Sequence, residues 1–408
     1  MNMGNMASLA GELLAKLCVD IPTRRLGSEG NRQASAVFDA WMGERGFIME
    51  RQEFDCQDWE TEGASLLAAG QCFSVFSSPH SNGCRVIAPL GMAASLEELE
   101  KVDAAGKILL LYGEITASQL MPKGYPFYFP DEHRRIYDLL EEKQPAAIIT
   151  ATGCNPELAG AMYPFPMIED GSFDIPSVYM TDVEGVRLAA LAGQQVELVS
   201  NARRIDSHGW NSVAKINPQI QLRVVLCAHI DAKPGTPGAL DNASGVITLM
   251  LLGERLRQSP VRLGVDILII NGEDHYQARG EVVYLERMGA KIQNVSLAIN
   301  LDGLGHVGDD VACSLYGCPE DLAETVCRVL SAQPGMLEGD PWYQGDHMVF
   351  LQNGRPAVAI TSADLGGLMS QITHTAKDSP DQVDPSRLAQ TALALYELLR
   401  ALDEEGAG

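Results

Sequence analysis

The stretch Val224-Val225-Leu226-Cys227-Ala228-His229-Ile230-Asp231 decides the fold, because five apolar residues run directly into polar ones. A short continuous apolar run is typical of a strand that is buried on both faces of a sheet. The pattern recurs in Ile267-Leu268-Ile269-Ile270, followed by Asn271-Gly272-Glu273-Asp274, and in Leu297-Ala298-Ile299-Asn300-Leu301, followed by Asp302. We therefore predict buried parallel strands with acidic and histidine side chains at their carboxyl ends.

Helical segments separate these strands. From about residue 217 onward we expect strands at 222–228, 264–270, 297–301, 311–316 and 356–361, and helices at 244–257, 281–288, 320–332 and 385–402. The opening segment predicts helices at 8–18 and around 34–42, with Gly46 as the terminating glycine, and a strand at 47–54. This alternation favours an α/β fold, with a mostly parallel mixed sheet covered by helices on both faces.

The middle of the chain has a different pattern of apolar and turn residues. Short apolar runs at 107–112, 146–150, 176–180 and 196–199 are separated by Gly and Pro turns, and helices are expected near 131–142 and 182–191. No cluster of ligand residues is recognisable there. We therefore expect a discontinuous catalytic domain, residues 1–57 and 205–408, and a β-rich accessory domain inserted at 58–204.

Composition excludes several classes of partner. The chain has 30 Lys plus Arg against 54 Asp plus Glu, a net charge of −24, which disfavours nucleic acid and anionic membrane surfaces. The nine cysteines are an odd number without zinc-ribbon spacing, and several lie in apolar runs. The sequence has no recognisable secretion signal or long apolar span. We expect reduced thiols and a cytoplasmic location.

Acidic and histidine residues gather at the expected strand ends, where sites form in sheets of this kind. The set comprises His229, Asp231, Asp241, Glu273, Asp274, Asp302 and His374. Crowded carboxylates repel one another and raise their own pKa values unless a cation compensates them. Taken singly, each residue also fits an ordinary role, such as a helix cap, a turn or a surface histidine. Together they predict a metal site.

The number and type of these residues indicate a centre with two ions. Five ligand candidates exceed what one tetrahedral site needs, and mixed imidazole and carboxylate ligation suits Zn²⁺, with Mn²⁺ or Co²⁺ as alternatives. With Asp241 bridging, His229 and Asp302 complete one site. Asp274 and His374 complete the other, about 3.5 to 4 Å away. Glu273 is then the general base, and Asp231 either fixes the tautomer of His229 or is a plain turn residue.

These residues resemble the co-catalytic zinc aminopeptidase family that includes bacterial leucyl aminopeptidase, yeast aminopeptidase Y and glutamate carboxypeptidase II. The segments that carry the resemblance are Arg24-Arg25-Leu26-Gly27-Ser28 with Asn31-Arg32, Ala228-His229-Ile230-Asp231, Gly238-Ala239-Leu240-Asp241-Asn242-Ala243-Ser244-Gly245, Gly272-Glu273-Asp274, Asn300-Leu301-Asp302, Gly345-Asp346-His347 with Phe350 and Gly354-Arg355-Pro356, and Thr373-His374-Thr375 with Asp378. The resemblance implies the zinc exopeptidase fold, which is phosphorylase/hydrolase-like, a peptide substrate, and aminopeptidase activity.

The chain departs from that family at two places. Glu273-Asp274 stands where the family usually has Glu-Glu, so this ligand is one methylene shorter. The glycine-rich Gly-Ser turn that follows in relatives is replaced by residues 275–281, so the substrate-facing wall and the specificity of relatives do not carry over to this chain. The middle segments 106–113, 146–149 and 175–178 look like a protease-associated domain. Its aromatic loop 125–129 is either a lid or a plain surface loop.

Other functions stay open from the sequence. A carboxypeptidase or dipeptidase of the same family differs mainly by an arginine for the substrate carboxylate, and Arg279 and Arg355 are both unassigned. A glutaminyl cyclase shares the sheet and ligand set but works through one zinc, and a receptor-like scaffold has lost ligands. The GxGxxG match at 303–308 leads into a strand, which argues against a dinucleotide site. The sequence does not define the oligomeric state, and a homo-oligomer is compatible with it.

Overall fold

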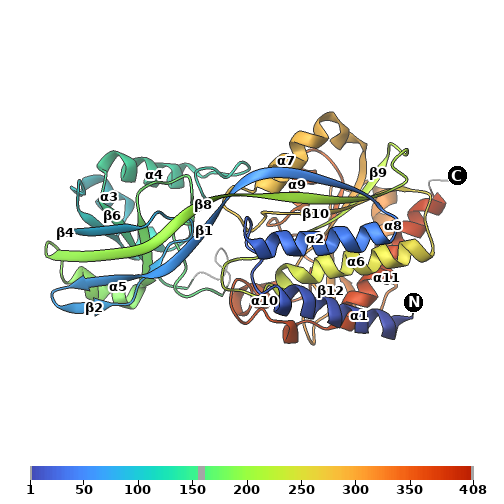
Figure 1. The fold of residues 1–408 in the computed structure, drawn as a ribbon. Helices are drawn as coiled ribbons and strands as arrows, with labels where there is room; N and C mark the ends of the chain where they lie inside the picture. Colours follow the sequence, from blue (N-terminus) through green and yellow to red (C-terminus); the bar gives the residue numbers. More distant parts are fainter. Residues whose placement is uncertain (1, 155–160, 406–408) are drawn as a thin grey trace. The chain divides into compact units, whose positions relative to one another are not determined.

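The computed structural model describes residues 2–154 and 161–405. The chain divides into two compact units, Met1–Cys56 with His208–Gly408 (unit 1) and Gln57–Ser207 (unit 2). It passes from one unit to the other within β1 (Ile48–Ala68) and β8 (Gln195–Ile216). Figure 1 shows the elements of each unit. Each unit has its own hydrophobic core, so each is described by itself.

Unit 1 is built on a mixed sheet whose central strands are parallel. Its further strands are β9 (Arg223–His229), β10 (Gly264–Ile270), β11 (Val295–Leu301), β12 (Val311–Tyr316), β13 (Met336–Glu338) and β14 (Ala357–Ser362). The order is β13-β12-β14-β11-β9-β10-β8. The strands β14, β11, β9 and β10 run parallel, while β12 and β8 are antiparallel to their neighbours β14 and β10. The carboxyl ends of the four parallel strands therefore lie at one edge.

Helices cover both faces of this sheet. They are α1 (Met3–Ala15), α2 (Glu29–Glu44), α6 (Ser244–Gln258), α7 (Arg279–Met288), α8 (Glu320–Leu330), α9 (His347–Leu351), α10 (Leu365–Gln371) and α11 (Pro385–Glu405). On one face α6 packs against α1, α2 and α11, which lie side by side in Figure 1. On the other face α7 contacts β10, and α9 contacts β11 and β14. Short helical turns complete the unit at η1 (Lys16–Asp20), η4 (Gly289–Asn294) and η5 (Pro380–Gln382).

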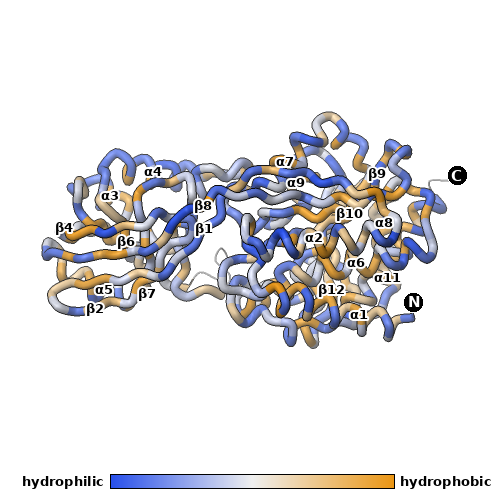
Figure 2. The backbone as a smooth tube through the Cα atoms, viewed as in Figure 1, coloured by the Kyte–Doolittle hydropathy of each residue, from blue (hydrophilic) through white to orange (hydrophobic). Residues whose placement is uncertain are grey.

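The alternation of side chains along each strand explains this layering. In β9, Leu226 joins the core beneath α6, while Val225 and Cys227 join the core beneath α7 and α9. Figure 2 shows β9 and β10 largely in the hydrophobic colour. A strand buried on both faces needs apolar residues at every position, which is why the apolar run predicts it.

The second helix shows how local sequence sets its ends. The Ser28 side chain accepts a hydrogen bond from the Asn31 backbone N–H and so caps the first turn of α2. Phe38 and Met42 lie one turn apart on the buried face. The helix ends at Glu44, and Gly46 has a φ of 83°, a backbone conformation that favours glycine.

The structure confirms the predicted fold class, a mixed and mostly parallel sheet with helices on both faces. The strands β10 and β12 have the predicted bounds. The helix expected at 244–257 begins at Ser244 as predicted, and Asp241 and Asn242, which precede it, have non-helical backbone angles. Other bounds differ from expectation. The strand expected at 196–199 is part of the much longer β8.

Unit 2 has strands and helices of its own. Its strands are β2 (Gln71–Phe73), β3 (Phe76–Ser77), β4 (Cys84–Ala93), β5 (Ile108–Leu111), β6 (Ala147–Thr152) and β7 (Ser177–Thr181), and its helices are α3 (Leu96–Lys101), α4 (Asp131–Lys143), α5 (Asp182–Ala189) and the turn η2 (Gly113–Thr116). The strands β4, β5, β6 and β7 are parallel. Among residues 2–154 and 161–405, none of the helices combines the length and the apolar character needed to cross a membrane.

The central position of β11 predicts a large stability effect. Ile299 is 0% exposed in the core beneath α6, so we expect Ile299→Ala to lower the free energy of unfolding by about 2 to 5 kcal/mol. Val307→Ala is the control, because Val307 is 52% exposed and should cost less than about 0.5 kcal/mol. Urea unfolding measures both, and equal midpoints for the two variants would contradict the assigned core.

Candidate metal centre

The carboxyl edge of the central strands brings the predicted ligands together. His229 is the last residue of β9, Asp302 follows β11 directly, and Asp274 lies in the loop after β10. Asp241 comes from the irregular segment η3 (Ala239–Ala243) between β9 and α6, and His374 from the loop after α10. Because these strands are parallel and in register, their ends place residues that are far apart in the chain at one point.

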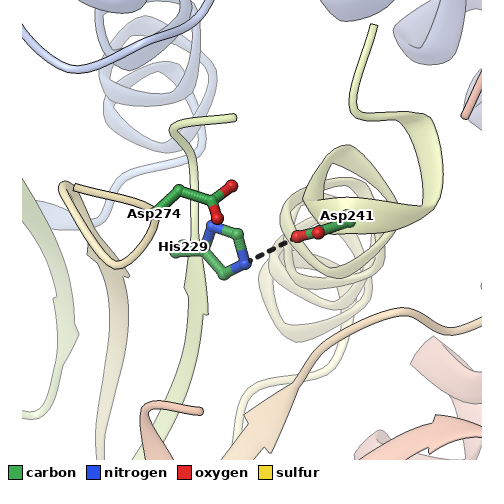
Figure 3. Close-up of side chains that lie close together, drawn as sticks. All are labelled: His229, Asp241 and Asp274. Atoms are coloured by element: carbon green, nitrogen blue, oxygen red, sulfur yellow. Dashed lines mark ion pairs between the residues drawn. The ribbon is translucent and has the colours of Figure 1, made fainter. Parts of the chain in front are cut away.

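One carboxylate lies between the two histidines. Asp241 Oδ1 is 3.1 Å from His229 Nε2, and Asp241 Oδ2 is 3.2 Å from His374 Nε2. Each histidine also faces a second carboxylate: Asp302 Oδ1 is 3.5 Å from His229 Nε2, and Asp274 Oδ1 is 3.4 Å from His374 Nε2. His229, Asp241 and Asp274 offer ligand atoms within 4.8 Å of one another (Figure 3). The five ligand candidates therefore form two half-sites that share Asp241.

The electrostatics of this cluster favour a bound cation. Burial lowers the pKa of His374, but the carboxylates of Asp274 and Asp241 outweigh it and raise that pKa to about 10. His229 has a pKa raised well above its ordinary value in the same way, chiefly by Asp302. Within the described part of the chain, both ring nitrogens of His229 and Asp274 Oδ2 are buried without a hydrogen-bond partner. Imidazole nitrogens and carboxylate oxygens that lack hydrogen-bond partners and lie among negative charges are suitable ligands for a divalent ion such as zinc.

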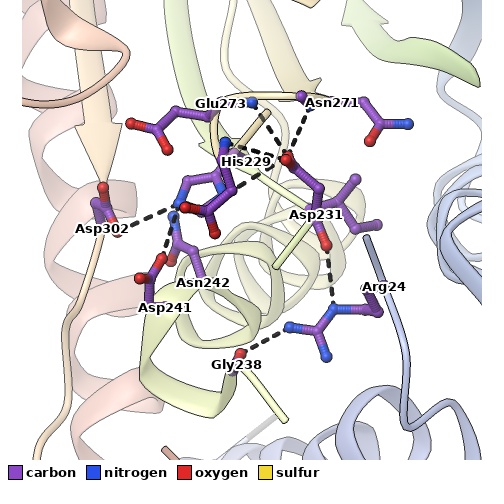
Figure 4. A network of polar contacts seen from close by, with 12 residues as sticks. Arg24, His229, Asp231, Gly238, Asp241, Asn242, Asn271, Glu273 and Asp302 are labelled. Carbon is purple, nitrogen blue, oxygen red and sulfur yellow. Dashed lines mark hydrogen bonds and ion pairs between the residues drawn. The ribbon is translucent and has the colours of Figure 1, made fainter. Parts of the chain in front are cut away.

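Asp231 holds the loop that carries two other site residues. Its carboxylate accepts hydrogen bonds from the backbone N–H groups of Gly272 (2.7 Å), Glu273 (3.3 Å) and Asp274 (3.0 Å). Figure 4 shows this group beside His229. Asp231 Oδ1 is 3.7 Å from His229 Nδ1, which is longer than a hydrogen bond. The hydrogen bonds of Asp231 therefore orient the loop, while the expected control of the imidazole tautomer stays a prediction.

The proposed base lies in an acidic environment. Burial raises the pKa of Glu273 well above its usual value, and Asp274, Asp302 and Asp346 add to this effect while His229 opposes it. A raised pKa makes a carboxylate a stronger proton acceptor, which is the property that a general base requires. A bound cation would lower the pKa of Glu273 and so oppose this rise.

Two buried carboxyl groups were not predicted as part of the site. Asp346 is 2% exposed, and neither of its carboxylate oxygens has a hydrogen-bond partner among the described residues. Burial and then Glu281 raise the pKa of Asp346. Glu281 is itself buried, and its pKa is raised by burial and by Glu273. The motif Gly345-Asp346-His347 could have pointed to Asp346 as a site residue. Glu281 lies in the segment 275–281, which departs from the family.

The two unassigned arginines have protein partners. Arg355 donates from Nε to the Val295 carbonyl at 2.7 Å and from Nη1 to Gln293 Oε1 at 3.3 Å. Arg279 Nη1 lies 3.9 Å from Glu286 Oε1. Arg355 is thus engaged at the amino end of β11, far along the strand from Asp302, and is not placed to bind a substrate carboxylate at the site.

Comparisons with known proteins identify the class. Residues 211–399 match the family model described as "Peptidase family M28". The curated "Uncharacterized protein YfbL" of Escherichia coli (strain K12) is 25% identical over 229 residues, which cover 46% of this chain and 70% of that protein.

Solved structures share the fold. The zinc aminopeptidase BSAP from Bacillus subtilis superposes with a TM-score of 0.72 at 19% identity, covering 96% of this chain and 94% of that one. The glutaminyl cyclase from Fimbriiglobus ruber has a TM-score of 0.53 at 14% identity, covering 97% and 95%. At such identities the likeness concerns the fold alone.

An α/β sheet with histidines and carboxylates gathered at its carboxyl edge has the features of a metal-binding site. More specifically, residues 211–399, a little under half of the chain, match the model of peptidase family M28, and this match identifies a metallopeptidase. This match confirms the resemblance drawn from the ligand segments.

The role of Asp231 predicts a loss of metal affinity on substitution. In Asp231→Asn an amide NH₂ replaces one acceptor oxygen and faces backbone N–H groups, so the loop carrying Asp274 loses its fixed position. We expect zinc affinity, measured by competition with a chelating dye, to fall by about 10- to 100-fold. The control is Asp403→Asn, because Asp403 also accepts a backbone N–H, from Arg262 at 3.2 Å, but lies on α11. Unchanged affinity in Asp231→Asn would contradict this role.

Proposed function

We propose that this protein is a metal-dependent exopeptidase, and most specifically an aminopeptidase that removes N-terminal residues from peptides. The observation that supports this best is the shared carboxylate: the two oxygens of Asp241 face two different histidines, and each histidine has a second carboxylate of its own. This arrangement offers ligands for two ions, whereas a single ion would use only one of the two groups. Peptide hydrolysis is the chemistry that family M28 is named for.

In this proposal five residues hold two zinc ions. His229, Asp241 and Asp302 would hold one ion, and Asp241, Asp274 and His374 the other, with Mn²⁺ or Co²⁺ as possible substitutes. When bound, such ions supply Lewis acidity, which lowers the pKa of water and polarises a carbonyl group. Asp274 is a competent oxygen ligand although it is one methylene shorter than glutamate.

The protein's own groups supply the proton transfers. The Glu273 carboxylate would accept a proton from the attacking water and deliver it to the nitrogen of the leaving amine. The backbone of Glu273 is fixed by its hydrogen bond to Asp231, so the carboxyl group stays close to the ligand Asp274. Holding base and ligand on one loop keeps the proton acceptor at a constant distance from the centre.

The engagement of Arg355 with Val295 and Gln293 removes one of the two arginines that could bind a substrate carboxylate in a carboxypeptidase, and Arg279 is the one that remains. The fold shared with the zinc aminopeptidase BSAP is in line with amino-terminal cleavage. Glutaminyl cyclase activity is the second candidate, because the Fimbriiglobus ruber enzyme has a similar fold. A receptor-like scaffold is disfavoured, since Glu273 and all five ligand candidates are present.

Further parts of the proposal concern the setting of the enzyme. We propose that unit 2 is a protease-associated-like domain that shapes substrate access. The partner is a peptide, not nucleic acid or an anionic membrane, in line with the net charge of −24. A cytoplasmic location fits nine cysteines that are all free thiols, four of them buried.

A substrate screen tests the direction of cleavage. We expect aminoacyl and unblocked peptide substrates to be hydrolysed, their N-acetylated counterparts to resist, and all activity to disappear with a chelator and return with zinc. Loss of C-terminal residues from N-acetylated peptides would instead indicate a carboxypeptidase. Formation of pyroglutamate from N-terminal glutamine, with one zinc per chain, would indicate a cyclase, and no turnover of any substrate would indicate a scaffold.

Substitution of the base tests its role separately. Glu273→Gln should retain its bound metal, because the ligands are untouched, yet lose about 10²- to 10⁴-fold in kcat, because an amide does not accept the proton. Metal content is measured by elemental analysis and kcat with the best substrate of the screen. Glu286→Gln is the control, since Glu286 is 63% exposed and lies on α7. A near-normal kcat in Glu273→Gln would refute the assignment.

A further inference from the structure

Arg24 is a buried charge that touches both loops of the centre without touching a ligand side chain. It is 2% exposed, and its guanidinium donates from Nε to the Ile230 carbonyl at 3.0 Å and from Nη2 to the Gly238 carbonyl at 2.7 Å. Nη1 donates to the carbonyls of Leu17 at 2.9 Å and Pro237 at 2.8 Å. Ile230 follows the ligand His229, and Gly238 begins the segment that leads to Asp241 (Figure 4).

The same segment is held from its other side by Asp378. The Asp378 carboxylate accepts hydrogen bonds from the backbone N–H groups of Leu240 at 2.7 Å and Asp241 at 3.1 Å. The Asp378 carbonyl accepts a third from Ala239 at 3.2 Å. Arg24 thus donates hydrogen bonds to the carbonyls at the start of the segment, and Asp378 accepts hydrogen bonds from the N–H groups that follow.

The segment has no room to move toward Arg24. Gly238 has a φ of 62°, and a Cβ atom there would lie 2.7 Å from Arg24 Nη2 and 2.6 Å from the Asp241 carbonyl oxygen. Only glycine fits this close approach of backbone to guanidinium. Arg24 thus holds the backbone at Gly238, three residues before Asp241.

We propose that Arg24 is a positioning residue for Asp241, and that its guanidinium sets the distance between the His229 and Asp241 loops so that one carboxylate reaches both ions. This inference rests on the proposed two-metal function. The planar guanidinium carries five N–H donors in a rigid fork and so bridges carbonyls on separate segments. An ammonium group is a single point with flexible donors, so lysine does not reproduce the bridge.

A second buried arginine provides a matched control within the same unit. Arg223 donates to the backbone carbonyls of Ile216, Asn217, Ile220 and Val265 and pairs with Asp266. It is 7% exposed and is the first residue of β9, whereas His229 is the last. Because His229 lies six residues further along the strand, Arg223 is about 20 Å from it. Removing either guanidinium disturbs buried carbonyls, but only Arg24 reaches the ligand loops.

The test compares Arg24→Lys and Arg24→Met with Arg223→Lys and Arg223→Met in the full-length protein. We expect zinc affinity, measured by competition with a chelating dye, to fall about 10- to 100-fold in both Arg24 variants. The visible absorption spectrum with Co²⁺ should also change, because the ligand geometry around the ion changes. The Arg223 variants should lose thermal stability in chelator but keep the wild-type zinc affinity and Co²⁺ spectrum.

The outcomes separate this inference from the proposed function. Wild-type zinc affinity and Co²⁺ spectrum in a folded Arg24→Lys or Arg24→Met would overturn the positioning role even if the wild type is an active two-metal peptidase. Equal losses of affinity in the Arg24 and Arg223 variants would also overturn it, because the effect would then be general destabilisation. Should Arg24→Met fail to fold, Arg24→Lys decides. If the wild type does not bind two ions, the proposed function is contradicted, and this inference is contradicted with it.

Discussion

The structure depends on one electrostatic constraint: several carboxylates and two histidines share a largely buried site at the carboxyl edge of a buried sheet. Burying negative charges together is expensive unless positive charge compensates them. Here the two imidazoles lie within ion-pair distance of Asp241, Asp274 and Asp302, and both have raised pKa values. The site is thus built to hold positive charge, and a divalent cation supplies more of it than protonated histidine.

Most of the side chains that support this site act on backbone rather than on the ligands. Asp231 and Asp378 each accept backbone N–H groups next to ligand residues, and Arg24 donates to backbone carbonyls beside them. This arrangement suits loops that follow strand ends, because such loops have backbone groups that no sheet or helix satisfies. Because these hydrogen bonds go to the backbone, they leave the carboxylates of Asp241 and Asp274 free to face the histidines.

Much of the fold follows from the pattern of apolar residues. Runs such as 264–270 and 311–316 match β10 and β12, because a strand buried on both faces requires apolar residues throughout. The irregular segment around Asp241 was not foreseen, because its conformation depends on Arg24 and Asp378, which are distant in the chain. The length of β8 was missed as well, since its exposed polar stretch has no apolar periodicity.

The sequence by itself predicted His229, Asp274 and Asp302 for the centre, because side chains that follow buried parallel strands meet at one edge of the sheet. Only the tertiary structure decided how they pair. It placed Asp241 between the two histidines, directed Asp231 to the backbone at 272–274, and brought Arg24 to Gly238 across 214 residues of chain. Hydrogen bonds to backbone groups cannot be recognised from the sequence, because every residue carries the same carbonyl. The residues that make them are therefore known only once the segments are packed together.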